Sequence, residues 1–151
     1  MRCLDRYAEI KGIGYTSKNV KIVRNKNGKP YFENSDVNFS LSHTAGLTLV
    51  AMSGYNVGVD AELVREIGCR ERIAERFFTR GEAMKIKTAR DFFSTWAAKE
   101  AYAKYTSFGV ASFKKFDVRK LNDVYIKRLN VGRKYAAYCV SIDREIEYCE
   151  I

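Results

Sequence analysis

The sequence has little of what marks linkers, exported chains or membrane proteins: it contains one proline and one histidine in 151 residues, and no long unbroken apolar run. With only ten glycines beside that proline, the composition excludes a flexible linker. No segment approaches the length of a membrane-spanning helix. The first residues, MRCLDRYAEIKGIGY, lack the apolar core and the small-residue cleavage site of a signal peptide. These absences predict a soluble, cytoplasmic protein.

The cysteines are few and widely spaced, and none of them forms a CxxC pair. They are Cys3, Cys69, Cys139 and Cys149. Closely spaced cysteines are typical of zinc sites and of the disulfide frameworks of small secreted domains. The observed spacing favours neither, and it indicates a chain kept in a reducing compartment.

The rest of the composition is typical of a globular domain, with 46% hydrophobic and 13% aromatic residues. The length predicts a single domain over residues 1–151 that can bury a core without disulfides. Lysine and arginine outnumber aspartate and glutamate by 27 to 18, which gives a formal net charge of +9 and favours anionic ligands or acidic protein surfaces. Nucleic acid would also explain this charge. Because the basic residues are dispersed and no such module is recognisable, a nucleic-acid-binding module stays an alternative only.

Hydrophobic periodicity and turn residues predict strands, then helices, then strands. Strands are expected at Val20–Arg24, Val37–Ser42, Leu47–Ser53 and Asn56–Asp60, and again at Phe116–Val118, Val124–Ile126 and Lys134–Ile142. Helices are expected at Leu4–Ile10, at Arg70–Phe77, from Thr79 onward, and at Arg90–Tyr105. This order is typical of an α+β fold with a mainly antiparallel sheet packed by helices.

Asp60 and Glu62 lie two residues apart in GVDAE, at the end of a predicted strand. In an extended strand both carboxylates project to the same side. They repel each other unless a cation lies between them, and Mg²⁺ binds through one or two carboxylates, water and substrate phosphates. Taken alone, the pair is more typical of an ordinary solvated turn.

Glu100 and Lys104 occur in TWAAKEAYAKY, on the helix that is predicted to turn its aromatic residues inward. At about 100° per residue, Glu100 lies about 40° from Trp96 around the helix axis, so it borders the apolar face. A glutamate and a lysine spaced by four are common on helix surfaces, where they contribute only about 0.2–0.5 kcal/mol. An exposed pair would lie opposite the apolar face. We therefore expect partners for this pair, such as a metal and a phosphate.

Lys29, Ser42 and His43 form a third polar group. Lys29 lies in the turn NKNGKP, and His43, the single histidine, directly follows Ser42. A lone histidine after a strand is most often a structural hydrogen-bonding residue. Separately, Thr79 and Glu82 fit a TxxE capping box at the start of the next helix.

Five motifs, in chain order, resemble those of the 4′-phosphopantetheinyl transferases of the surfactin-synthetase-activating type: GKP, FSLSH, GVDAE, FFTRGEA and WAAKEAYAK. They extend from about Lys29 to Gly109, more than half of the chain. The resemblance implies a fold of that family and a holo-[acyl-carrier-protein] synthase activity. In this reaction the phosphopantetheine of coenzyme A is transferred, with Mg²⁺, to a serine of an acyl or peptidyl carrier protein, and adenosine 3′,5′-bisphosphate is released. Such carriers serve fatty acid, polyketide or nonribosomal peptide biosynthesis.

The resemblance also implies roles for single residues. By motif, the metal ligands are Asp60, Glu62 and Glu100, and the coenzyme A contacts are Lys29, Ser42, His43, Lys99 and Lys104. A serine hydroxyl that attacks a phosphoryl group needs charge neutralisation and a proton acceptor. The expected catalytic residues are therefore Lys104 for the charge, and Glu100 or Glu82, directly or through a water, for the proton. The capping box remains the alternative for Glu82.

Two features depart from the family pattern. Ser107 stands where the first glycine of KxxGxG is usual, whereas Gly109 is kept, so the loop after the helix is expected to bend differently. The segment before Asp60 is short compared with the first half of the larger members. The missing elements would be absent or supplied by a second copy in a homo-oligomer, and a relative that binds coenzyme A but has lost turnover is a further alternative.

The net charge also predicts that the chain attracts a carrier protein by opposite charge. Carrier proteins of this class present an acidic helix beside the modified serine. We expect part of the matching basic surface to come from the predicted helical region, whose basic residues are Arg70, Arg72, Arg76, Arg80, Lys85 and Lys87. A merely solvated helix face is the alternative for each of them.

Overall fold

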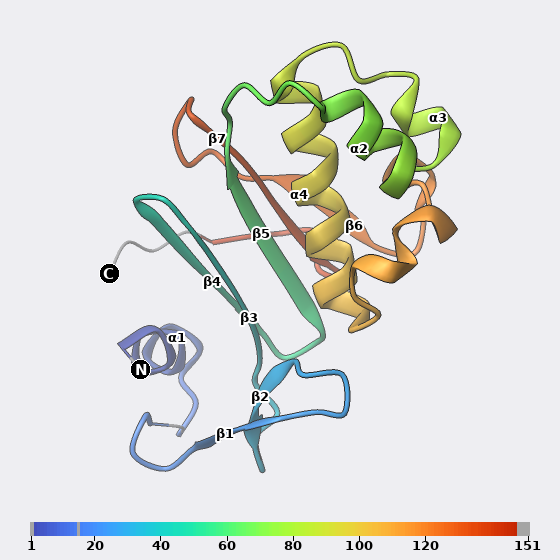
Figure 1. Ribbon diagram of the computed structural model, residues 1–151. Helices are drawn as coiled ribbons and strands as arrows, with labels where there is room; N and C mark the ends of the chain where they lie inside the picture. Colours follow the sequence, from blue (N-terminus) through green and yellow to red (C-terminus); the bar gives the residue numbers. More distant parts are fainter. Residues whose placement is uncertain (1, 15, 148–151) are drawn as a thin grey trace.

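The computed structural model describes residues 2–14 and 16–147, and it has the predicted α+β architecture (Figure 1). Its elements, in chain order, are α1 (Arg2–Lys11), β1 (Lys21–Arg24), β2 (Pro30–Glu33), β3 (Asn38–Thr44), β4 (Leu47–Ser53), β5 (Val57–Leu63), α2 (Arg70–Phe77), α3 (Arg80–Ala83), α4 (Ala89–Thr106), η1 (Val110–Lys115), η2 (Val118–Lys120), β6 (Tyr125–Arg128) and β7 (Tyr135–Ser141). The strands form the hairpins β1–β2 and β3–β4 and the three-stranded sheet β5–β7–β6, and every strand pair is antiparallel. The prediction of a mainly antiparallel α+β fold is confirmed.

The helix α4 lies against one face of the β5–β7–β6 sheet, with α2 and α3 on the far side of α4 (Figure 1). The opposite face of β5 carries Val57, Val59 and Ala61, which pack against apolar residues of β4 and β7. Alternation along a strand then places the even-numbered residues, Asp60 and Glu62 among them, on the side of α4. The strand thus has one apolar face and one face that brings two carboxylates to the helix.

Gly58 sets the spacing between β5 and α4. A Cβ atom at this position would lie 2.0 Å from the carbonyl oxygen of Ala101 and 2.6 Å from the backbone nitrogen of Tyr105. Any side chain here would force the helix away from the strand. Glycine therefore permits the close approach at which α4 residues reach Asp60.

The free edge of β5 is satisfied by side chains of β3. The N–H groups of Val59, Ala61 and Leu63 donate to hydroxyl oxygens at 3.0, 3.1 and 3.3 Å, respectively. The accepting residues are Ser40, Ser42 and Thr44. Because an unpaired buried N–H group is costly, these three hydroxyls replace a neighbouring strand and attach the β3–β4 hairpin to the sheet.

Two predictions of secondary structure were wrong. Pro30, expected in a turn, begins the four-residue strand β2, which pairs with β1 across the turn closed by Gly28. In the segment Phe116–Val118, expected as a strand, Phe116 and Asp117 instead join the two 3₁₀ helices η1 and η2, and Val118 begins η2. The backbone groups of the segment bond to side chains: the carbonyl of Phe116 accepts from Lys99, and the N–H of Val118 donates to Glu82.

The ends of the helices are well marked by sequence. Thr88 and Asp91 form a capping box at the start of α4, and Thr79 and Glu82 form one at the start of α3. At the other end of α4, Ser107 has a φ of 62° in the left-handed region, where glycine is usual. The loop thus turns in the conformation that the family's glycine would favour, although a serine occupies the position.

None of the helices in the described residues is long and apolar enough to cross a membrane. Cys3, Cys69 and Cys139 are free thiols, and Cys149 lies outside the described residues.

Candidate functional site

Three carboxylates influence one another where β5 faces α4. Asp60 is buried, with 5% of its surface exposed, and Glu62 and Glu100 are half-buried. Burial, followed by the negative charge of Asp60, raises the pKa of Glu100 from 4.5 to about 7. The same two causes raise the pKa of Glu62. The inward Glu100 that the sequence predicts is thus part of a crowded anionic site.

The two carboxylate oxygens of Asp60 have different surroundings. Oδ1 accepts hydrogen bonds from the hydroxyl of Ser42 at 2.9 Å and from Nζ of Lys104 at 2.8 Å. Oδ2 is buried and has no hydrogen-bond partner in the described part of the chain. A buried oxygen that lacks a partner costs free energy, so Oδ2 is where a bound cation would be most stabilising.

Lys104 joins three parts of the site. Besides Asp60, its ammonium group donates to the carbonyl oxygens of Leu41 on β3 and Val59 on β5, each at 3.1 Å. These bonds use all three of its protons. Lys104 therefore fixes α4 to both strands, and a direct contact with a phosphate would require it to release one of these acceptors.

The three carboxylates fit a magnesium ion by their chemistry. Mg²⁺ prefers oxygen ligands, and it commonly takes one or two carboxylates and several waters. A cation would also offset the negative charge of Asp60, which adds to burial in raising the pKa values of Glu62 and Glu100. Among residues 2–14 and 16–147, no three carboxylate, imidazole or thiol groups lie close enough to hold a metal in the present arrangement.

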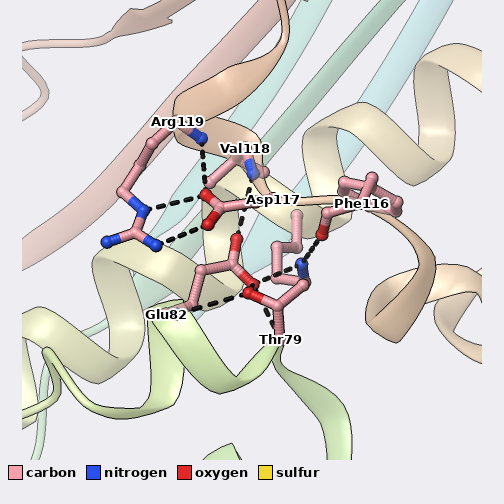
Figure 2. Close-up of polar contacts among 7 residues, drawn as sticks. Thr79, Glu82, Phe116, Asp117, Val118 and Arg119 are labelled. Carbon is pink, nitrogen blue, oxygen red and sulfur yellow. Dashed lines mark hydrogen bonds and ion pairs between the residues drawn. The ribbon is translucent and has the colours of Figure 1, made fainter.

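Glu82 and Lys99 form a separate ion pair, shown in Figure 2 with its surroundings. Their side chains meet at 2.8 Å, and Lys99 also donates to the carbonyl of Phe116 at 2.7 Å. Glu82 accepts three further hydrogen bonds, from the N–H and hydroxyl of Thr79 and from the N–H of Val118. The pair ties α3, α4 and the segment between η1 and η2 together.

This geometry favours a structural part for both residues. Lys99 has none of its surface exposed and Glu82 only 2%, so neither presents an atom to a ligand. The capping box at Thr79 and Glu82 is confirmed. The neighbours whose charges affect Lys99 are Glu82, Asp117 and Arg119, whereas those that affect Glu100 are Asp60, Lys104 and Glu62. Adjacent residues of one helix thus belong to two different groups of charges.

The expected coenzyme A contacts are divided between two faces of β3. The hydroxyl of Ser42 points inward to Asp60 and Ala61, whereas His43 is exposed on the opposite face. Lys29 lies before β2, where its ammonium group donates to the carbonyl of Val57 at 3.1 Å. Burial lowers the pKa of Lys29. Ser42 is therefore drawn into the carboxylate site, apart from His43.

Sequence reasoning missed the roles of Gly58, Ser40 and Thr44. The hydroxyls of Ser40, Ser42 and Thr44 recur at every second residue of FSLSHT, which is the period of a strand and places them on one face. That regularity could have indicated a row of hydroxyl groups on one face of the strand. The partners of the hydroxyls, backbone N–H groups of β5, leave no trace in the sequence.

The basic residues between the two motifs form a mixed surface. Arg72, Arg76, Arg80, Lys85 and Lys87 are exposed, as expected. Arg70 is instead half-buried and lies in ion pairs with Glu66 and Glu71.

Comparison with known proteins matches residues 56–148 to the family model described as the 4′-phosphopantetheinyl transferase superfamily. The chain is 31% identical over 107 residues to "4′-phosphopantetheinyl transferase gsp" of Aneurinibacillus migulanus, covering 67% of this chain and 44% of that protein. It is 34% identical over 98 residues to "4′-phosphopantetheinyl transferase psf-1" of Bacillus pumilus, covering 58% and 41%. The chain thus spans less than half the length of these curated relatives.

Proposed function

Because the chain belongs to the 4′-phosphopantetheinyl transferase superfamily, we propose that it transfers the 4′-phosphopantetheine group of coenzyme A to a serine of an acyl or peptidyl carrier protein. The observation that carries this proposal is the buried Asp60 beside Glu62 and Glu100, because its Oδ2 has no hydrogen-bond partner in the described part of the chain. Such an arrangement is costly for a folded chain unless a cation binds it.

Asp60, Glu62 and Glu100 are the residues proposed to hold Mg²⁺. When bound, Mg²⁺ would neutralise charge on the pyrophosphate of coenzyme A. Lys104, whose ammonium group lies against Asp60, adds positive charge on the same side. A phosphate could displace one of its two backbone acceptors, which are the more weakly held because they are neutral.

The chemical step makes one bond and breaks one. The carrier serine oxygen attacks the phosphorus that carries the pantetheine group, and the bond from that phosphorus to the bridging pyrophosphate oxygen breaks. Adenosine 3′,5′-bisphosphate leaves, and the serine proton passes to a base. We propose Glu100 as that base, directly or through a water, because its carboxylate lies beside Asp60 at the site proposed for the reaction. Glu82 is bound in its ion pair and is not proposed as the base.

His43 and Lys29 are proposed to contact the 3′-phosphoadenosine end of coenzyme A. His43 is exposed on β3 and free to meet a dianionic phosphate. If this is its role, His43→Ala weakens coenzyme A binding far more than dephospho-coenzyme A binding, as calorimetric titration of the two ligands would reveal. Equal weakening of both would remove His43 from the 3′-phosphate.

One alternative is a relative that binds coenzyme A without turnover. The two proposals differ in one experiment: the purified chain is incubated with coenzyme A, Mg²⁺ and an apo carrier protein, and the intact mass of the carrier is measured. Transfer adds one phosphopantetheine group to the carrier, and Asp60→Asn serves as the inactive control. Coenzyme A binding without a mass change would favour the alternative.

A further inference from the structure

Ser42 has its hydrogen-bonding groups committed inside the protein. Its one proton goes to Oδ1 of Asp60 at 2.9 Å, and its oxygen accepts the N–H of Ala61 at 3.1 Å. Only 5% of its surface is exposed. A serine hydroxyl has a single proton to donate, so none remains for a phosphate oxygen of a ligand.

The contacts of Asp60 are also one-sided. Ser42 and Lys104 both donate to Oδ1, from two different elements, and the buried Oδ2 receives no hydrogen bond from residues 2–14 or 16–147. Two donors on one oxygen restrain the rotation of the carboxylate, and with it the position of the buried Oδ2. Groups that orient a metal ligand in this way commonly change metal affinity by about 10–100-fold when removed.

We propose that Ser42 is a positioning residue for Asp60, which orients Oδ2 toward the metal site, and that it is not a contact for coenzyme A. This inference rests on the proposed function for the identity of the site, but it concerns a different residue and a different readout. It departs from what the resemblance to the family implies for Ser42.

Ser40 provides a matched control on the same strand. It is as buried as Ser42, with 4% of its surface exposed, and it accepts the same kind of bond, from the N–H of Val59 at 3.0 Å. No carboxylate bonds to Ser40 among the described residues. Ser40→Ala and Ser42→Ala therefore remove equivalent attachments of the hairpin to β5, and only the second also removes a donor from Asp60.

The test measures Mn²⁺ binding to the full chain by calorimetric titration in the absence of coenzyme A. Ser42→Ala should weaken Mn²⁺ binding by about 10–100-fold, whereas Ser40→Ala should change it by less than about twofold. Both variants should lower the urea midpoint of unfolding by similar amounts. In metal-free buffer, coenzyme A binding should be equal in the two variants.

Loss of coenzyme A affinity in Ser42→Ala alone, with Mn²⁺ affinity unchanged, would overturn the inference in favour of a ligand contact. Equal Mn²⁺ affinity in Ser40→Ala and Ser42→Ala would overturn it in favour of simple attachment. If Ser42→Ala does not fold, Ser42→Thr and Ser42→Val form a pair of equal shape, and only the threonine should keep the wild-type Mn²⁺ affinity.

Failure of the proposed function gives a different result. A wild-type chain that binds Mn²⁺ in a Ser42-dependent way but modifies no carrier protein would remove the transferase proposal and support the positioning role. A wild-type chain that binds no Mn²⁺ would overturn the metal site and the inference with it.

Discussion

Two lysines of α4, five residues apart, each pair with a carboxylate, and the two pairs differ in how completely the carboxylate oxygens are hydrogen-bonded. Lys99 meets Glu82 and Lys104 meets Asp60, each at 2.8 Å. Around the first pair, both carboxylate oxygens accept hydrogen bonds, and Lys99 also lies over the ring of Phe116. Around the second pair, Oδ2 of Asp60 has no partner among the described residues, and two more carboxylates raise the local negative charge.

This difference distinguishes the structural pair from the pair proposed to be functional better than burial does. The more deeply buried pair is Lys99–Glu82, yet it offers no atom to a ligand. The Asp60–Lys104 pair retains an oxygen that a folded chain would normally satisfy. An incomplete set of hydrogen bonds on Asp60, beside two glutamates whose pKa values are raised by burial and then by the charge of Asp60, marks the second pair as the candidate for chemistry.

Removing Lys99, the cation of the pair with Glu82 in which both carboxylate oxygens are hydrogen-bonded, should have the largest effect on stability. Lys99→Met leaves the carboxylate of Glu82 buried without its positive partner, and such a change typically costs about 3–5 kcal/mol. We expect a corresponding fall in the free energy of unfolding, measured by urea titration. Transfer activity per folded molecule should remain close to that of the wild type at low temperature.

The double variant Lys99→Met/Glu82→Leu tests whether the cost comes from the unpaired charge. It removes both charges, so it should recover part of the lost stability, but not the capping bond to Thr79, worth about 1 kcal/mol, nor the bonds to the backbone of Phe116 and Val118. If Lys99→Met were as stable as the wild type but inactive, the assignment of the two pairs would be reversed.

The sequence alone predicted α4, from which both lysines extend, and several other elements, because their patterns are long and regular. β4 and α2 have the predicted bounds, and α4 differs by one residue at each end. It also predicted that Glu100 faces inward, because that follows from its angular distance to Trp96. The separation of Lys99 from Glu100 could not be predicted, since it depends on Glu82 and Phe116, each 17 residues away along the chain.

The strand predicted at Phe116–Val118 illustrates the same limit. Alternating apolar residues indicate a strand only if a neighbouring strand satisfies their backbone groups. Here the side chains of Lys99 and Glu82 satisfy them, so the segment needs no strand partner. Short patterns are thus decided by tertiary contacts, which also explains why β2 was missed.

Neutralising Asp60, the carboxylate of the pair with Lys104, should affect activity far more than stability. Asp60→Asn keeps an oxygen that can accept from Ser42 and Lys104, but it removes the negative charge at Oδ2. We expect a loss of transfer activity of roughly a hundredfold or more, with the free energy of unfolding unchanged or raised because repulsion with Glu62 and Glu100 falls. Initial rates from carrier mass measurements and a urea titration provide the two readouts.

Glu75→Gln, an exposed carboxylate on α2, is the matched control for the loss of one negative charge. It should leave the transfer rate near that of the wild type. Near-normal turnover of Asp60→Asn at saturating Mg²⁺ would contradict the metal site.

The stability of the chain and its affinity for a metal should also depend on pH, through Glu100 beside Asp60. Its pKa is raised from 4.5 to about 7, so between these values the folded chain holds a proton that the unfolded chain has lost. Stability without metal should therefore fall as pH rises from about 4.5 to 7, and level off above. Mg²⁺ binding must release that proton, so its affinity should decrease by up to about tenfold per pH unit below 7.

Calorimetric titration with Mg²⁺ at pH 6, 7 and 8 measures this dependence, and Glu100→Gln should abolish the part due to Glu100. Because Lys99→Met leaves the three carboxylates in place, it should keep the wild-type pH dependence. A profile unchanged in Glu100→Gln would assign the proton to another group.

Salt should weaken the attraction that the exposed surface charges exert on a carrier protein. We expect this effect to be smaller than those of the variants above. The exposed cations near α2 and α3 are proposed to attract an acidic carrier protein, and attraction between solvated charges is screened within about 10 Å at 0.1 M salt. We expect the carrier KM to rise by roughly tenfold between low and high ionic strength, with a smaller change in kcat because solvated surface charges act mainly on association. Arg76→Glu/Lys85→Glu should raise the carrier KM at low salt without altering coenzyme A binding. The control, Lys26→Glu/Arg128→Glu, changes the net charge equally at exposed positions of the β1–β2 turn and β6, and it should have a weaker effect. A carrier KM that responds to neither salt nor the first double reversal would show that docking is apolar and that the positive charge serves a different partner.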